Sequence, residues 1–302
     1  MLQSRARVVS ATRSCGAVRS ARHPVKVEAA GSNPVRTASS KARCPRHRAF
    51  GVVGETRGTV VSYRYATERT DHSALASGQV LRSAPGYPGF PVRLASELLQ
   101  RAMVHVEGDR VRLWDPCCGS GYLATVLGLL HRDRLTHVRA TDVDEDATGI
   151  AARNLELLTA EGLAEREREL RRSARDFGRV TFVERAEAAR DLASGLAETG
   201  GDLPHESGVA DVFGLTEPVD ADLVITDVPY GEMTQWEGAV PDGDPIRGLL
   251  ASMGRVLPPH AVAVVTARTR RVVLPEGVRA LERVKVGNRS AALVRARELV
   301  SI

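Results

Sequence analysis

The sequence predicts an α/β fold, in which a mostly parallel, doubly wound sheet ends in an antiparallel last strand. Two observations support this prediction. Short apolar runs alternate with helical periodicities along the chain, and this alternation is typical of parallel strands joined by helical crossovers. The first apolar run leads into a glycine loop, Gly119-Ser120-Gly121. Such folds bind ligands there, beyond the carboxyl ends of the strands.

The predicted elements begin with a helix that follows Pro91, a residue suited to the first helical turn. Asp244 is the expected N-cap of the last helix, before Pro245. Two alternating segments flank Gly287-Asn288 and predict a hairpin, which supplies the antiparallel strand. The expected helices are 91–104, 123–130, 147–158 and 244–257, and the expected strands are 111–114, 138–143, 209–213, 221–226, 261–267, 281–286 and 291–295.

Two segments fall outside this alternation. Residues 160–205 hold a dense mixture of charges, and pairs such as Glu167 and Arg171 support exposed helices. We expect a charged helical insertion, either a solvated helical pair or a segment that grips a large substrate. Residues 1–58 are Arg- and Ser-rich without periodicity, so we expect a disordered basic tail before a folded domain over 59–302. Three alternatives remain for the tail: it is a transit peptide, it results from a start codon assigned too far upstream, or it is a basic arm that grips RNA.

Composition limits the class of protein. No apolar run reaches the roughly 18 residues that span a bilayer, so we expect a protein with no membrane segment. The four cysteines lack the spacing of a disulfide scaffold or a zinc site, which favours a reducing cytoplasm and no metal. We expect a monomer.

The net charge of +5 is unevenly distributed. Residues 1–58 carry 12 Lys and Arg against 2 Asp and Glu, so the basic balance comes from the tail. Within the folded body, residues 255–302 carry 10 basic and 3 acidic side chains. This C-terminal edge is therefore a candidate surface for nucleic acid.

Candidate cofactor residues lie where predicted strands end. Gly119 and Gly121 let the backbone pass close under a ligand, and the helix that follows offers N–H groups to a carboxylate. Asp115 either caps this turn or accepts from a cofactor amine. Asp142 lies 21 residues after Gly121, where an acid binds ribose hydroxyls, and Asp144 is the alternative.

A second signature, Asp227-Val228-Pro229-Tyr230, ends the fourth predicted strand. It combines a carboxylate, a carbonyl and an aromatic ring, a set that suits a planar group with an exocyclic amine. Asp227 and the Val228 carbonyl would accept both N–H groups of the amine, and Tyr230 would stack on its ring. Hydride transfer has no need of this tetrapeptide, so the signature favours methyl transfer over a nicotinamide cofactor.

At these signatures the chain resembles the class I S-adenosylmethionine-dependent methyltransferases, which have a Rossmann-like fold. Within them it resembles the amino-methyltransferases whose strand-4 motif is Asn/Asp-Pro-Pro-Tyr/Phe, although Val228 replaces the first proline. The resemblance implies S-adenosylmethionine as cofactor, with Asp211 at the adenine amine. It also implies that the segment from Phe90 closes over the methionine end. Cys117 is a further loop residue at the cofactor, and Trp236 and Arg289 are candidate substrate-binding residues.

From residue 63 to about 297 the chain resembles a narrower group, the avilamycin-resistance ribosomal RNA methyltransferases. The segments that carry this resemblance are 83–88 with 90–93, 113–122, 228–232 and 287–291. It implies transfer of a methyl group to the N2 amine of a guanine in 23S rRNA, within the free RNA or the large ribosomal subunit, and resistance to orthosomycin antibiotics. The alternatives are an amine on DNA or a protein glutamine, a nucleotide-binding oxidoreductase, and a catalytically silent RNA-binding protein.

Overall fold

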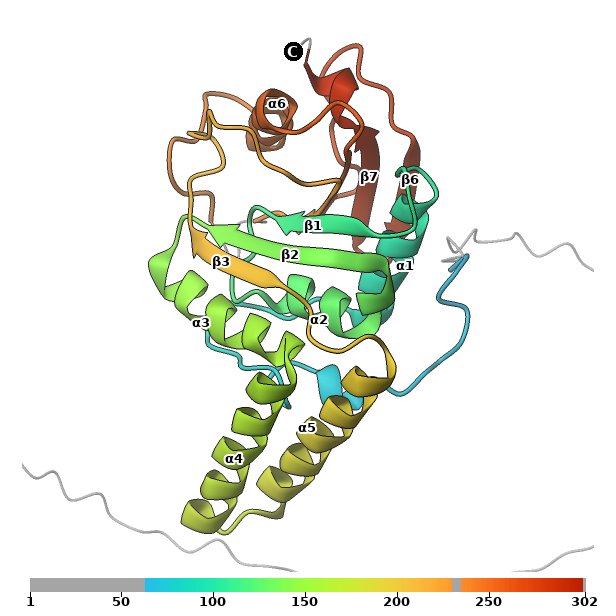
Figure 1. Ribbon diagram of the computed structural model, residues 1–302. Coiled ribbons are helices and arrows are strands. Elements are labelled where there is room, and N and C mark those ends of the chain that lie inside the picture. The colour runs from blue at the N-terminus through green and yellow to red at the C-terminus, as the bar shows by residue number, and fades with distance from the viewer. Residues whose placement is uncertain (1–62, 230–234, 301–302) are drawn as a thin grey trace, which may run out of the picture. The chain divides into compact units, whose positions relative to one another are not determined.

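The computed structural model describes residues 63–229 and 235–300 (Figure 1). The expected tail over 1–58 and the candidate residue Tyr230 lie outside this part of the chain. Within it, seven strands form one sheet in the order β3-β2-β1-β4-β5-β7-β6. The strands are β1 (Val111–Asp115), β2 (Leu135–Asp142), β3 (His205–Val209), β4 (Leu223–Asp227), β5 (Val262–Ala267), β6 (Glu282–Val286) and β7 (Arg289–Arg295).

The strand directions confirm the predicted fold class. Strands β3, β2, β1, β4 and β5 run parallel, whereas β7 is antiparallel to both β5 and β6. Because the five parallel strands all point the same way, their carboxyl ends meet at one edge of the sheet. That edge positions the candidate site.

Helices cover the two faces of the sheet and bury a separate apolar cluster on each. The α-helices are α1 (Val92–Met103), α2 (Tyr122–Leu130), α3 (Glu145–Leu155), α4 (Ala160–Phe177), α5 (Val180–Glu198) and α6 (Pro245–Val256). Short 3-10 helices are η1 (Ser73–Leu75), η2 (Arg132–Arg134), η3 (Glu156–Leu158) and η4 (Ala296–Leu299). Strand β5 contributes to both clusters, with Val264 in the α1 and α2 cluster and Val265 in the α6 cluster. Such two-sided burial explains its continuous apolar run.

The third strand differs from the prediction. We expected it over 209–213, but β3 ends at Val209 and pairs with β2 at the edge of the sheet. Val209 is its only large apolar residue and none of its five residues is buried, so no apolar run marks it. Val212 belongs instead to the cluster under α6, which is why the run around it resembled a strand.

Two helices, α4 and α5, occupy most of the stretch 160–205 and lie side by side (Figure 1). Thr159 caps α4 by accepting from the Gly162 N–H at 3.0 Å, and Gly178 ends it in the left-handed conformation. Leu163 of α4 and Ala189 of α5 join the same apolar cluster as α1 and α2. No helix in the described residues is long and apolar enough to span a membrane.

Two glycines in helices provide a matched test of how closely helix α6 packs against η4. Gly254→Ala should lower the free energy of unfolding by about 1 to 3 kcal/mol, because the new methyl group would lie 2.4 Å from the backbone oxygen of Leu299. Gly149→Ala in α3 is the control, since its Cβ would meet nothing within 4 Å. This control should gain up to about 1 kcal/mol from helix propensity. Urea unfolding followed by circular dichroism measures both, and equal shifts would contradict close packing of α6 against η4.

Candidate active site

A cavity of about 300 Å³ opens at the carboxyl ends of the parallel strands. Its volume lies within the usual range for sites that hold a small ligand. Most of the predicted site residues line it: Phe90, Asp115, Cys117, Gly119, Asp142, Asp211, Asp227, Pro229 and Trp236. Gly121, Val228 and Arg289 do not belong to the lining.

The two loop glycines serve different purposes. Gly119 lines the cavity with a backbone φ of 51°, a conformation that residues other than glycine rarely adopt. Gly121 also has positive φ, but a Cβ there would lie 2.8 Å from the Cβ of Ala151 in α3. Gly121 therefore allows α2 and α3 to pack closely and does not itself face the cavity.

Asp142, the last residue of β2, holds the glycine loop. Its Oδ2 accepts from the Gly119 N–H at 2.7 Å, and its Oδ1 accepts from the Asp144 N–H at 3.2 Å. Burial raises the pKa of the Asp142 carboxyl, against the opposing effect of the Gly119 N–H. This carboxylate lines the cavity and also holds the backbone of Gly119, which lines it too.

Asp144, the alternative ribose residue, is the N-cap of α3. Its Oδ1 accepts from the Asp146 and Ala147 N–H groups, and its Oδ2 accepts from the Tyr87 hydroxyl at 2.5 Å. That hydrogen bond raises the pKa of Tyr87 to about 12. Tyr87 lines the cavity and was not among the predicted site residues, although it lies within the family segment 83–88.

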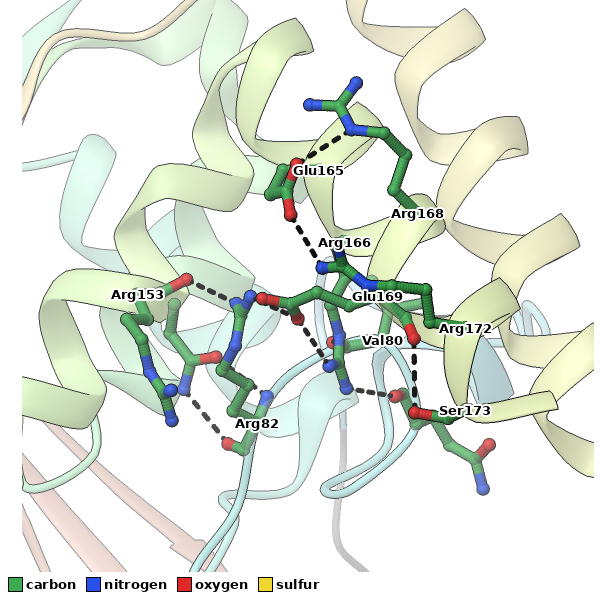
Figure 2. A network of polar contacts seen from close by, with 11 residues as sticks. Val80, Arg82, Arg153, Glu165, Arg166, Arg168, Glu169, Arg172 and Ser173 are labelled. Carbon is green, nitrogen blue, oxygen red and sulfur yellow. Dashed lines mark hydrogen bonds and ion pairs between the residues drawn. The ribbon is translucent and has the colours of Figure 1, made fainter. Parts of the chain in front are cut away.

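A polar network anchors the start of the segment that carries Tyr87. Figure 2 shows Arg82 between the backbone carbonyl of Arg153 in α3 and the carboxylate of Glu169 in α4. Glu169 also accepts from Arg166, which donates in turn to the Val80 carbonyl at 2.8 Å. The helices α3 and α4 thus hold residues 80–82, just before the cavity wall.

The same network reaches the glycine loop through Asn154 of α3. The Asn154 amide donates to the carbonyls of Arg82 and Ser120, and its oxygen accepts from the Arg82 N–H. Asn154 is fully buried, so these hydrogen bonds satisfy a polar group that would otherwise be costly to bury. One side chain therefore sets the spacing between the wall segment and the loop.

Asp115, at the end of β1, is a buried carboxyl beside this loop. Burial raises its pKa to about 7, and the nearby carboxylates of Asp142 and Asp227 act in the same direction. The Cys117 N–H approaches its Oδ1 at 3.4 Å, which is a long contact. A cationic group in the cavity would stabilise the ionised form of Asp115.

The acidic lining of the cavity favours S-adenosylmethionine over a nicotinamide dinucleotide. Five aspartates line the cavity, namely Asp115, Asp142, Asp144, Asp211 and Asp227. S-adenosylmethionine carries a sulfonium and an ammonium group and fits this lining, whereas the pyrophosphate of a dinucleotide would meet like charge. Among the residues that the structure describes, no group of His, Cys, Asp or Glu side chains is arranged to hold a metal ion.

The two adjacent cysteines of the loop are free thiols that are poorly suited to nucleophilic chemistry. Burial raises the pKa values of Cys117 and Cys118 well above the ordinary thiol value. Because the thiolate is the reactive form, both thiols are poor nucleophiles. They fill the turn between β1 and the glycine loop.

Asp211 and Trp236 join two loops at the far wall of the cavity. Asp211 accepts from the Phe213 N–H at 2.9 Å and from the Ala239 N–H at 2.6 Å. The rings of Trp236 and Phe213 lie 5.7 Å apart at a tilt of 48°. The chain after β4 is thereby tied to the chain after β3, and both aromatic side chains pack against the cluster under α6.

Asp227, the last residue of β4, has a carboxylate paired with two side chains. It accepts from the Thr266 hydroxyl at 2.5 Å and from the Arg289 guanidinium, which contacts both carboxylate oxygens. Burial raises the pKa of Asp227, and Arg289 opposes that shift. The Val228 N–H donates to the Thr266 carbonyl at 2.9 Å, so the sheet ladder continues past Asp227.

Arg289, a candidate substrate-binding residue in the sequence, is buried beside Asp227. Only 5% of its side chain is exposed, and its guanidinium lies 4.7 Å from the centre of the Phe90 ring. It lies behind Asp227 instead of in the cavity lining, because β7 begins next to the end of β5. The geometry makes Arg289 a positioning residue for Asp227.

The sheet order, the glycine loop and the acidic cavity define a Rossmann-like class I methyltransferase that depends on S-adenosylmethionine. Sequence comparison identifies the particular group. The family described as rRNA methyltransferase AviRa matches residues 61–289, and the chain belongs to this family. This confirms the resemblance found in the sequence.

Two kinds of relative agree with the family assignment. The 23S rRNA (guanine(2535)-N(1))-methyltransferase of Streptomyces viridochromogenes is 52% identical over 246 residues, which cover 79% of this chain and 98% of the relative. Two solved structures of rRNA methyltransferase aviRa from the same organism share 51% identity and a TM-score of 0.72. Each matches 80% of this chain and 98% of its own.

The Asp115 pKa predicts a pH dependence of cofactor affinity. Because a bound cation favours ionised Asp115, the affinity for S-adenosylmethionine should rise roughly tenfold from pH 5.5 to 7, as the carboxyl titrates with its pKa of about 7. Asp115→Asn should bind weakly with a flatter pH profile, and the exposed variant Asp133→Asn should behave as wild type. Calorimetric titration measures all three.

The stability of the same variant provides a control. In the cofactor-free protein the raised pKa of Asp115 means that folding stability falls as pH rises from about 4 to 7, since ionising the buried carboxyl is unfavourable. Asp115→Asn should therefore unfold no more easily than wild type at pH 8. If the cofactor affinity of Asp115→Asn depended on pH in the same way as that of wild type, Asp115 would not belong to the cofactor site.

The network of Figure 2 predicts an effect on the cavity from outside it. Glu169→Gln removes the charge between Arg82 and Arg166, so the wall segment should loosen and cofactor affinity should fall by about two- to tenfold. Glu165→Gln is the matched control on α4, because Glu165 pairs with Arg168 and Arg172 at the exposed surface. Calorimetric titration compares the two, and equal affinities would show that the network does not support the wall.

Proposed function

We propose that the protein transfers a methyl group from S-adenosylmethionine to a guanine base of 23S rRNA. The observation that carries this proposal is that Asp227 lines the same cavity as Asp115 and Asp142. One end of the cavity then suits a cofactor, and the Asp227 end suits the group that receives the methyl. The 52% identical relative, named for a guanine in 23S rRNA, supports the choice of substrate.

Four residues would hold the cofactor, which supplies an electrophilic methyl group when bound. Asp115 would pair with the ammonium, and Asp142 would accept from the ribose hydroxyls. The backbone around Gly119, at the start of α2, would donate to the methionine carboxylate. Asp211 would accept from the adenine amine.

We propose guanine N1 as the leading target atom, as in the name of the relative. Guanine N1 carries a proton, which must leave when the new N–C bond forms. Asp227 is a suitable acceptor, because burial raises the pKa of its carboxyl while Arg289 and Thr266 orient it. The base nitrogen would face the methyl group while Asp227 holds the departing proton.

The N2 amine, which the sequence predicted, is the second candidate. The tetrapeptide Asp227-Val228-Pro229-Tyr230 favours it, since this motif suits an exocyclic amine. N1 and N2 are neighbouring atoms on one edge of guanine, so a small rotation of the base exchanges them. Tyr230 would stack on the base in both cases.

An rRNA substrate would place the protein in the cytoplasm. The family resemblance further suggests protection against orthosomycin antibiotics. Growth of cells with and without the gene in graded orthosomycin concentrations tests that role. Equal sensitivity of both strains would leave the methylation proposal intact and remove resistance from it.

The target atom and the role of Asp227 can be tested together. Labelled-methyl transfer to large-subunit rRNA, followed by nucleoside mass analysis, should yield 1-methylguanosine. Asp227→Asn should lower kcat by about 100-fold or more with little change in cofactor affinity, because it removes the proton acceptor. Asp220→Asn, at a carboxylate that is 77% exposed, is the matched control.

The other products separate the remaining possibilities. N2-methylguanosine would keep the site and exchange the target atom. Labelled adenosine or cytidine would overturn the choice of base. Label confined to DNA or protein would overturn the ribosomal substrate.

A further inference from the structure

A second hollow, distinct from the acidic cavity, lies against the edge strand β6. It is lined by the cationic side chains of Arg270, Arg271, Arg283 and Lys285, here called the cationic groove. The remaining lining residues are Val272, Val284, Ser290 and Ala291, so none of the described residues that line it is acidic. Its volume is about 590 Å³.

Strand alternation explains why cations gather there. Glu282 and Val284 of β6 face α1, since Glu282 pairs with Arg101 and Val284 joins the cluster under α1. Arg283 and Lys285 point to the opposite face. Their partners on β7 are Ala292 and Ser290, and Ser290 lines the groove with the two cations.

Hydrogen bonds hold two of the four cations, and no carboxylate among the described residues forms an ion pair with any of the four. Arg283 donates to the Val272 carbonyl at 2.8 Å, and Lys285 donates to the Thr269 carbonyl at 2.9 Å. Carbonyl acceptors position these side chains without neutralising them. Burial and, to a lesser extent, the neighbouring charge of Arg271 lower the pKa of Arg283.

The groove adjoins the proposed catalytic carboxylate. Ser290, which lines the groove, follows Arg289, which binds Asp227. Ser290 pairs with Ala267 of β5, one residue after the Thr266 that also binds Asp227. At about 3.3 Å per residue, the groove begins roughly 3 Å, or one residue, along the strands from the residues that bind Asp227.

We infer that the cationic groove binds backbone phosphates of the rRNA strand next to the nucleotide whose base enters the cavity. Four cations without an ion-pair partner among the described residues, beside the proposed catalytic carboxylate, match a polyanion that carries its reactive base on the same strand. The inference rests on the proposed function, because it assigns the phosphates of that same substrate. It gives the enzyme an RNA contact that carries position and no sequence information.

The double variant Arg270→Gln/Arg271→Gln tests the groove. Both side chains are exposed, so the fold should tolerate their replacement. The control is Arg134→Gln/Arg297→Gln, which removes two exposed arginines at the end of the sheet where the parallel strands begin, by the amino end of β2 and the carboxyl end of β7. The two proteins have the same net charge, so any difference between them reports the place of the charge.

Binding to a large-subunit rRNA fragment is measured at several salt concentrations, together with methyl-transfer kinetics and cofactor affinity. The groove variant should bind RNA roughly tenfold more weakly at 0.15 M salt. The slope of log affinity against log salt should fall by about 1.4, since each lost contact to a single strand contributes about 0.7. KM for RNA should rise while kcat stays within about twofold and cofactor affinity is unchanged.

The outcomes separate the inference from the function on which it rests. If wild type and control methylate rRNA and the groove variant matches them in RNA affinity and salt slope, the groove is not the phosphate site. If the groove variant loses kcat or cofactor affinity instead of RNA affinity, the residues act on the catalytic site and the inference also fails. If wild type transfers no methyl to rRNA, the proposed function fails and takes this inference with it.

Discussion

The structure depends on one electrostatic constraint: neighbouring strands β2, β1 and β4 each end in an aspartate that is buried (Asp115) or half-buried (Asp142 and Asp227), and all three line one cavity. Burial raises the pKa values of Asp142, Asp115 and Asp227, so each ionised form needs a donor or a cation nearby. The fold supplies these partners unequally. Asp142 has the Gly119 N–H, and Asp227 has Arg289 and Thr266, whereas Asp115 has the Thr226 hydroxyl nearby and a long contact from the Cys117 N–H, with no cationic side chain paired to it among the described residues. That inequality leaves Asp115 as the acid best suited to pair with a cationic ligand.

The fold could largely be predicted from the sequence because its central strands are buried on both faces. β4 and β5 are continuous apolar runs, and Asp244 caps α6 as expected. β3 escaped prediction because an edge strand buries little and so carries no apolar pattern. The run around Val212 was instead a loop packed under α6.

The candidate site was less predictable wherever a role depends on contacts between distant segments. Asp115 and Asp227 could be identified because each ends a strand, and strand ends meet at one edge. The same reasoning cannot place Arg289, which reaches Asp227 across 62 residues through the antiparallel pairing of β7 with β5. It also missed Tyr87, whose place in the wall is set by Asp144 and, through Arg82, by the helices α3 and α4.

Arg289 is where two opposite charge environments meet. On one side lies a cavity lined by aspartates, and on the other the cationic groove begins at the next residue, Ser290. The acidic cavity favours a cation and the groove favours a polyanion. Electrostatic attraction alone would therefore direct S-adenosylmethionine to the cavity and the RNA backbone to the groove. Because Arg289 is buried and paired with Asp227, it separates the two regions without occupying either. The reacting base would then be held at the boundary, where the Asp227 carboxylate lines the acidic cavity and the RNA backbone follows the basic edge.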